Sequence, residues 1–218
     1  MTRKNFIAIF LISLSCAAML IVDGIWQPGY WIKSAVKIVL FLALPIIYSI
    51  ALRDHSLRSI FYLSKQGLLR AAALGLVVYC VIVGAYFLMR NYIDFSPVLN
   101  NLPDGVTKTP FPFVALYISF VNSLLEEFFF RGFAFLSLRE RMHGASLFSA
   151  AAFALYHTAM MLGWFPPVIF ILALGGLTVG GMLFNWLDKH DGTIYCGWLV
   201  HMFANFAINT VGMMLFYQ

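Results

Sequence analysis

Long, almost uninterrupted apolar segments alternate along the chain with short segments that carry most of its charges. A helix needs about 20 apolar residues to cross the hydrocarbon core of a bilayer. The apolar segments are continuous and do not alternate with a period of two, which argues against a transmembrane barrel. We predict an all-α, polytopic transmembrane bundle of about seven spans, at 5–22, 33–52, 70–89, 112–135, 146–164, 167–187 and 194–217.

The composition supports a membrane protein. Of the 218 residues, 62% are hydrophobic and 11% are charged, whereas a soluble domain carries about 25% charged residues. These values exclude an ordinary soluble globule, a disordered chain and a disulfide-stapled secreted module. A net charge of +5 would suggest nucleic acid as the partner of a soluble protein. Here the bases lie between apolar runs, so we predict a lipid bilayer as partner and no nucleic acid.

The basic residues predict an orientation. With the N-terminus in the cytoplasm, nine of the fourteen lie on the inner side, which is the bias that the positive-inside rule describes. These nine are Arg3, Lys4, Arg53, Arg58, Lys65, Arg70, Arg139, Arg141 and Lys189. We therefore predict a multi-pass protein of the cell membrane with a cytoplasmic N-terminus. The first apolar run is long and lacks a clear cleavage site, so we expect it to be a retained anchor.

Two polar segments divide the chain. The longest, at about 90–111, contains three prolines and is the expected external loop. It separates residues 1–111, an N-terminal three-helix part, from residues 112–218, a four-helix part expected to contain the active-site core. The segment 53–70 mixes bases with large apolar residues, and we predict an amphipathic helix on the inner headgroups.

Two acids lie side by side inside the fourth apolar run. A charged residue at the bilayer centre costs about 2.5–3.5 kcal/mol, so it normally faces a protein interior or a wet cavity. Glu127 and Arg131 are four residues apart and are expected to pair on one helix face. Glu126 points about 100° away and has no cation close in sequence, which favours it as a general base. The alternative is that the three residues only hold helices together.

Three further polar residues lie inside later spans: His157 in the fifth, and His201 with Asn205 in the seventh. A single histidine in a membrane helix commonly makes only an interhelical hydrogen bond. However, at about 1.5 Å per residue, Glu126, His157, His201 and Asn205 all lie roughly 10–16 Å from the inner edge. This agreement in depth predicts that the four side chains meet.

A carboxylate, imidazoles and an amide together suit activation of water and stabilisation of an oxyanion. In that scheme Glu126 takes a proton from water and His157 holds the water or protonates the leaving amine. His201 and Asn205 donate to the oxyanion. The same acids and histidines could ligate a metal, but no HExxH motif occurs and Asn is a poor zinc ligand. We therefore predict neither a cofactor nor a metal.

The sequence around these residues resembles the CAAX protease and bacteriocin-processing (Abi) family. The resemblance covers about 112–210 and rests on three ordered motifs, EExxxR, FxxxH and HxxxN. They are Glu126-Glu127-Phe-Phe-Phe-Arg131, Phe153-Ala-Leu-Tyr-His157 and His201-Met-Phe-Ala-Asn205. The family includes type II CAAX prenyl endopeptidases, which are glutamate-dependent intramembrane proteases. The resemblance implies that Glu126 activates water with support from Glu127 and Arg131. It implies His157 as a second catalytic group and His201 with Asn205 as the oxyanion site.

We therefore expect an intramembrane endopeptidase that hydrolyses a peptide bond of a membrane-associated protein or peptide. Two alternatives remain open. One is a zinc-dependent membrane protease that uses the same residues. The other is a non-catalytic immunity or peptide-binding membrane protein, since the family also includes proteins linked to bacteriocin self-immunity.

Overall fold

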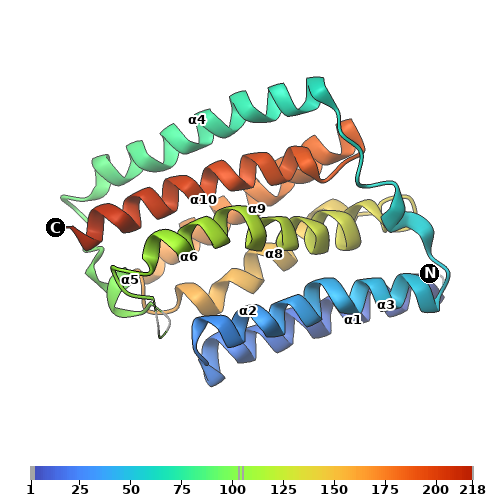
Figure 1. Ribbon diagram of the computed structural model, residues 1–218, viewed down its shortest axis with the longest axis horizontal. Helices are drawn as coiled ribbons and strands as arrows, with labels where there is room; N and C mark the ends of the chain where they lie inside the picture. Colours follow the sequence, from blue (N-terminus) through green and yellow to red (C-terminus); the bar gives the residue numbers. More distant parts are fainter. Residues whose placement is uncertain (1–2, 103, 105, 218) are drawn as a thin grey trace.

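The computed structural model describes residues 3–102, 104 and 106–217, and within these it is helical without any strand. Its helices form rods that run mostly along the longest axis (Figure 1). The α-helices are α1 (Arg3–Ile21), α2 (Tyr30–Ile38), α3 (Leu44–Ala51), α4 (Lys65–Met89), α5 (Ser96–Asn100), α6 (Phe111–Tyr117), α7 (Ser123–Glu126), α8 (Ala145–Met161), α9 (Pro167–Asp191) and α10 (Tyr195–Phe216). The π-helical segments are η1 (Val22–Trp26), η2 (Val39–Ala43), η4 (Ile118–Asn122) and η5 (Glu127–Leu136), and η3 (His55–Arg58) is a 3₁₀ turn.

The predicted helical membrane bundle is confirmed, with one difference in length. Six helical stretches of the described residues are long and apolar enough to cross a bilayer, and α8 is shorter. Its 17 residues extend roughly 26 Å, less than the hydrocarbon thickness of about 30 Å. The predicted span at 146–164 was too long because Gly163 takes a positive φ of 80° and Pro166 follows it.

The predicted amphipathic helix at 53–70 is wrong. Residues 59–64 are non-helical, and α4 already begins at Lys65, where the Ser64 hydroxyl accepts a hydrogen bond from the Gly67 amide. The segment instead crosses from α3 to α4 over the end of η5. There the Ile60 carbonyl accepts from the Ile194 amide at 3.1 Å. Leu57 and Ile60 of this segment are buried against the protein, whereas Phe61, Tyr62 and Leu63 are exposed.

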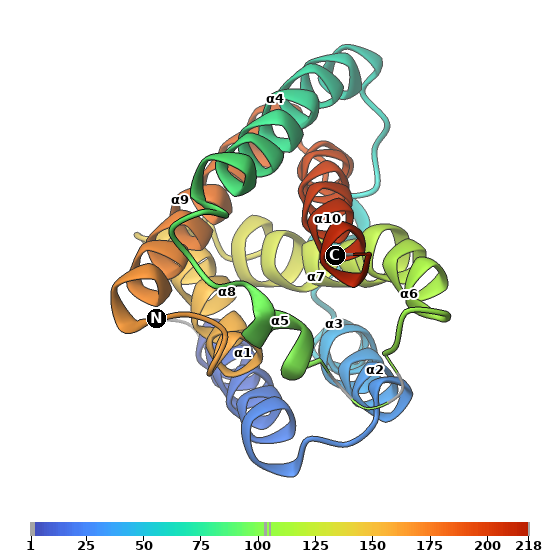
Figure 2. The ribbon, with the colours of Figure 1, turned by 90° about the vertical axis from the view of Figure 1, so that its left-hand side faces the viewer.

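The rods pack as a layered bundle around the Phe111–Leu136 helix (Figure 2). On one side α4 lies along α10, where a Cβ atom on Gly75 would lie 2.5 Å from the ring of Phe203. On the other side α1 packs on α8, and η2, between α2 and α3, packs on η5 through Phe41. The N-terminal helices therefore contact the elements that carry the acids.

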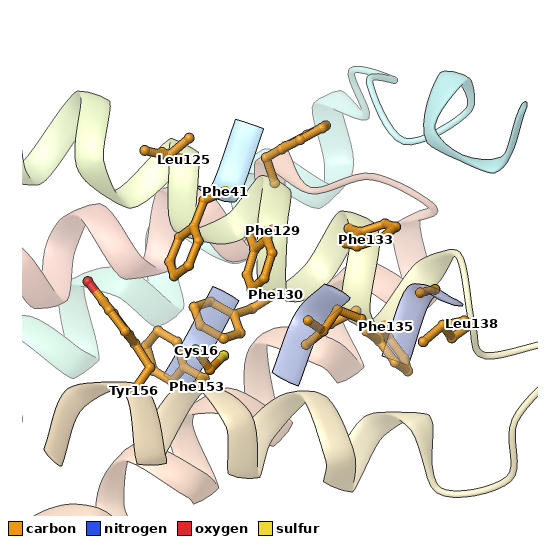
Figure 3. Close-up of a cluster of buried hydrophobic side chains, with 14 of the residues drawn as sticks. Cys16, Phe41, Leu125, Phe129, Phe130, Phe133, Phe135, Leu138, Phe153 and Tyr156 are labelled. Carbon is orange, nitrogen blue, oxygen red and sulfur yellow. The ribbon is translucent and has the colours of Figure 1, made fainter. Parts of the chain in front are cut away.

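A cluster of aromatic rings forms the core beside the central helix (Figure 3). The Phe41 ring stacks on Phe129 with centroids 4.1 Å apart, and Phe130 packs edge-on against Phe41 at 5.4 Å. Phe129 and Phe130 are fully buried. Tyr156 lies at the edge of this cluster with its hydroxyl pointing away from the rings. The three consecutive phenylalanines 128–130 are therefore packing residues.

Candidate active site

The central helix changes its hydrogen-bonding pattern around the two acids. It is π-helical over Ile118–Asn122, α-helical over Ser123–Glu126 and π-helical again over Glu127–Leu136. π-Helical segments are rare and are frequent at functional sites. Both carboxylates are buried, with 1% of Glu126 and none of Glu127 exposed. π-Helical segments therefore lie on both sides of the short α-helical segment that ends at Glu126, and Glu127 begins the second of them.

One oxygen of Glu126 is held by three donors. Its Oε1 atom accepts from Lys37 Nζ at 3.1 Å, from Asn122 Nδ2 at 2.9 Å and from the Tyr156 hydroxyl at 3.2 Å. Lys37 also donates to Asn122 Oδ1 at 2.7 Å and lies 5.1 Å from the centroid of the Tyr156 ring. These contacts fix the carboxylate, and with His157 we call them the Glu126 cluster: Lys37, Asn122, Glu126, Tyr156 and His157.

The other oxygen of Glu126 faces two imidazoles. Its Oε2 atom lies 3.8 Å from Nε2 of His157 and 3.7 Å from Nε2 of His201. Both distances exceed that of a direct hydrogen bond and match a gap that one bridging water can span. The predicted meeting of Glu126 with both histidines is therefore present.

The opposite ring nitrogens fix the histidines in place. His157 Nδ1 lies 2.7 Å from the Phe153 carbonyl, which can only accept, so this nitrogen carries a hydrogen. His201 Nδ1 lies 2.7 Å from Glu127 Oε1, and a carboxylate likewise favours a hydrogen there. In the neutral state both imidazoles therefore present the Nε2 lone pair to Glu126.

Glu127 belongs to a separate, fully buried group. Its Oε2 atom lies 3.2 Å from Nε of Arg131, which is the pairing that the i, i+4 spacing predicted. The guanidinium lies between two rings, 4.2 Å from the centroid of Phe153 and 4.8 Å from that of Phe184. Arg131 has no exposed surface. These contacts hold the guanidinium in an aromatic slot.

A third acid completes this group. Asp188 of α9 is fully buried and accepts from the Gly197 amide at 2.7 Å. A Cβ atom at Gly197 would lie 2.8 Å from Asp188 Oδ2 and 2.9 Å from Glu127 Oε2. Only glycine therefore lets α10 approach both carboxylates. We call Glu127, Arg131 and Asp188 the Arg131 cluster, and His201 connects it to the Glu126 cluster.

Asn205 makes a different contact from the one its predicted role needs. It lies one turn after His201 on α10, and its Nδ2 atom donates to the Ile118 carbonyl at 3.2 Å. That carbonyl belongs to the π-helical segment η4. Asn205 thus joins α10 to the central helix, and its predicted part in an oxyanion site stays a prediction.

Sequence reasoning missed Lys37, Tyr156 and Asp188. The expectation that Glu126 lacks a nearby cation was correct only for its own helix, because Lys37 is 89 residues away in sequence. A lysine inside an apolar run was itself a signal, since such residues usually face a protein interior. Asp188 lies just beyond the span predicted at 167–187, whereas the last turn of α9 buries it. Lys37 and Asp188 were missed because their contacts are made between helices.

A metal site is a separate question. In residues 3–102, 104 and 106–217, no group of three or more His, Cys, Asp or Glu side chains is arranged to hold a metal ion. The nearest approach to one is Glu126 with its two imidazoles. The zinc-dependent alternative therefore stays a prediction for direct measurement.

Comparison with known proteins identifies the segment that carries the three motifs. Residues 108–207, just under half of the chain, match the family model described as type II CAAX prenyl endopeptidase Rce1-like. Neither the curated proteins nor the solved structures gave a match. The matched segment begins before the central helix and ends after Asn205. It therefore includes Glu126, Glu127, His157 and His201. Over residues 108–207, the chain is therefore similar to the Rce1-like type II CAAX prenyl endopeptidases.

Proposed function

We propose that the chain is a glutamate-type intramembrane endopeptidase that cleaves a membrane-associated protein or peptide. The family indicates a membrane protease of the CAAX type, and the long apolar helices fit a multi-pass membrane protein. The observation that supports a glutamate-type reaction is that the two carboxylate oxygens of Glu126 have different surroundings. Three donors hold its Oε1 atom, while its Oε2 atom faces two imidazoles across a gap of one water molecule.

In the proposed reaction, a water between these groups is the nucleophile. Its oxygen attacks the scissile carbonyl carbon while Glu126 Oε2 takes one of its protons. The tetrahedral intermediate then collapses, the carbon–nitrogen bond breaks, and the proton passes to the leaving amine. His157 lies 3.8 Å from Oε2, where it orients the water and relays the proton.

His201 and Asn205 are proposed to stabilise the oxyanion. His201 can donate from Nε2 only when both ring nitrogens carry hydrogens, and Glu127 at 2.7 Å from Nδ1 is the counter-charge for that form. Donors aimed at developing charge in a water-excluded site are among the largest contributions to catalysis. Arg131 acts through Glu127 and is a positioning residue.

The proposed orientation places the N-terminus in the cytoplasm. The basic residues that predicted this orientation belong to the end of the bundle where the N-terminus, the start of α4 and the end of α9 lie (Figure 1). The positive-inside rule assigns such an end to the cytoplasmic face. Fusion of a reporter to each end of the chain in cells tests this side directly.

The test uses new carboxyl termini as its readout. The purified chain is reconstituted with membrane proteins from cells that lack it, in ¹⁸O-labelled water, and mass spectrometry identifies labelled C-termini. We expect labelled products from the wild type and from the exposed-acid control Glu140→Gln, and loss by about 10²–10⁴-fold for Glu126→Gln. Retained cleavage by Glu126→Gln would remove the proposed base.

Further arms separate the alternatives. Loss of cleavage with a chelator, together with stoichiometric zinc in the purified chain, would favour the zinc-dependent protease. Absence of labelled products from the folded wild type, with peptide binding retained in Glu126→Gln, would favour the non-catalytic protein. A comparison of farnesylated and unmodified peptides tests whether the prenyl group that the family description names matters for this chain.

A further inference from the structure

A groove of about 590 Å³ lies at the basic end of the bundle, away from the Glu126 cluster. It is bounded by the η2–α3 rod, by the segment that crosses toward α4, and by Phe128 of η5. Its lining includes Leu42, Ile46, Ile50, Arg53, Arg58 and Phe61. Its volume falls within the range of small-molecule sites, about 300–1,000 Å³.

The inner part of this groove is an apolar track. Leu42, Ile46 and Ile50 recur every four residues along one rod, so they form one stripe. From Leu42 to Ile50 the stripe extends roughly 12 Å along the rod. Phe61 closes the track by stacking on Phe128, with centroids 6.0 Å apart. Because 73% of Ile50 is exposed, the track opens sideways, toward the lipid that surrounds the bundle.

The outer end of the groove is positively charged without a counter-charge. Arg53 and Arg58 line it and are exposed, and neither forms an ion pair within the part of the chain that the structure describes. The nearby Asp54 is already committed to Arg141, with contacts of 2.7 and 3.1 Å. His55 adds a titratable group beside the two arginines.

The backbone at this end is also unusual. Arg53 has a φ of 48°, in the left-handed region that residues other than glycine rarely adopt. Its carbonyl accepts from Lys4 Nζ at 3.5 Å, and the Ser49 hydroxyl hydrogen-bonds the Asp54 carbonyl. Such backbone conformations persist where the surroundings fix them, and they cluster at binding sites. The fixed turn holds the Arg53 side chain at the mouth of the groove.

We propose that this groove binds one anionic phospholipid of the bilayer. Its phosphate lies between Arg53 and Arg58, because guanidinium groups match phosphate oxygens in geometry and charge. One acyl chain lies on the stripe of Leu42, Ile46 and Ile50. A soluble phosphate would not use the apolar track, and a zwitterionic lipid would leave the two arginines without a net counter-charge. The proposal is independent of the proposed protease activity.

The test places a fluorescent reporter in the groove. Phe61→Trp is reconstituted into nanodiscs with phosphatidylglycerol or phosphatidylcholine carrying brominated acyl chains, and the wild-type signal from the native tryptophans is subtracted. We expect half-quenching at about tenfold lower mole fraction of the anionic lipid. Adding Arg53→Gln and Arg58→Gln should reduce this preference to about twofold or less. The control Arg3→Gln, an exposed base at the same end, should leave it unchanged.

Three results would overturn the proposal. Equal quenching by the two lipids would mean ordinary surrounding lipid. A preference that survives in Arg53→Gln/Arg58→Gln would place the recognition elsewhere, once matching circular dichroism shows that this variant is folded. Displacement of the anionic lipid by soluble glycerol phosphate would indicate a site for free phosphate. Because none of these readouts uses cleavage, they are separate from the outcome for the proposed protease.

Discussion

The Glu126 cluster and the Arg131 cluster contain acids that are adjacent in sequence but differ in how completely they are engaged. In the Arg131 cluster, one oxygen of Glu127 pairs with the guanidinium and the other with His201. In the Glu126 cluster, one oxygen takes all three donors and the other faces only imidazole nitrogens beyond hydrogen-bond distance. A rotation of one residue along the helix thus separates an acid whose two oxygens face a guanidinium and an imidazole from an acid with one oxygen outside direct hydrogen-bond distance.

The balance of charge differs as well. The Arg131 cluster has two carboxylates against one guanidinium, all fully buried. The Glu126 cluster has one carboxylate against one ammonium, with neutral donors around it. Removing a cation should therefore affect folding more in the first cluster and chemistry more in the second. The predictions below test that division.

The largest effect on stability is expected from Arg131→Met. It leaves Glu127 and Asp188 buried without a cation, which should lower the free energy of unfolding by about 3–5 kcal/mol. Lys37→Met should cost about 1–3 kcal/mol, because Glu126 keeps its Asn122 and Tyr156 donors. Unfolding in detergent, followed by tryptophan fluorescence, measures both. Equal losses would contradict the distinction between the clusters.

A smaller loss of stability is expected from Gly197→Ala. The added methyl group would lie less than 3 Å from oxygens of both Glu127 and Asp188, and such overpacking typically costs about 1–3 kcal/mol. The matched control is Gly180→Ala, where no atom lies within 4 Å of the added carbon. It should be neutral or slightly stabilising. If the two variants unfold alike, the close approach at Gly197 is not a constraint.

Lys37→Met should slow cleavage by about 10–100-fold when rates are normalised to the folded fraction. This corresponds to about 1.4–2.8 kcal/mol, the range for a hydrogen bond to a charged group. We expect the loss in kcat with KM unchanged, because Lys37 contacts Glu126 and not the substrate. Lys33→Met is the control. Lys33 lies one helical turn before Lys37 and pairs with Asp23 at 3.2 Å, not with Glu126. A change in KM alone would argue against the positioning role.

The smallest effect concerns the ion pair at the basic end. Arg141 holds the pKa of the Asp54 carboxyl well below its usual range, with help from Ser56. The stabilisation is therefore fully present above the unfolded pKa of about 3.9 and is lost as the pH falls through the folded pKa. We expect less than about 1 kcal/mol. The melting temperatures of the wild type and Asp54→Asn should differ by a constant amount at neutral pH and approach each other as the pH falls below about 4, and a difference that stays constant there would contradict this.

Much of the fold follows from the pattern of apolar and polar residues along the sequence. Apolar runs of span length predicted the rods, and the i, i+4 spacing predicted the pair of Glu127 with Arg131. The depth argument predicted that four side chains meet; His157 and His201 do lie near Glu126, whereas Asn205 donates to the Ile118 carbonyl instead. These predictions succeed because the bilayer fixes helix direction and depth, so that polar residues at one depth have few partners other than each other.

The remaining features depend on how the rods rotate and approach. Lys37 reaches Glu126 from a helix whose direction was known but whose facing side was not. The π-helical segments change which side chains share a helix face, and no pattern in the local sequence predicts them. A Cβ atom at Gly175 or Gly180 would meet nothing within 4 Å, whereas a Cβ atom at Gly181 would lie 3.1 Å from Ala150. Packing between rods decides such details.

The fixed tautomers of the two histidines have a consequence for proton counting. In their neutral forms the two imidazoles and Glu126 Oε2 converge as three lone pairs. A single water brings only two hydrogens to them. One of the three acceptors then lacks a hydrogen. An additional proton would supply it, and this proton could move between Glu126 and the two imidazoles with little rearrangement. In the proposed reaction, the same shortage of hydrogens would favour transfer of a proton from water to this group.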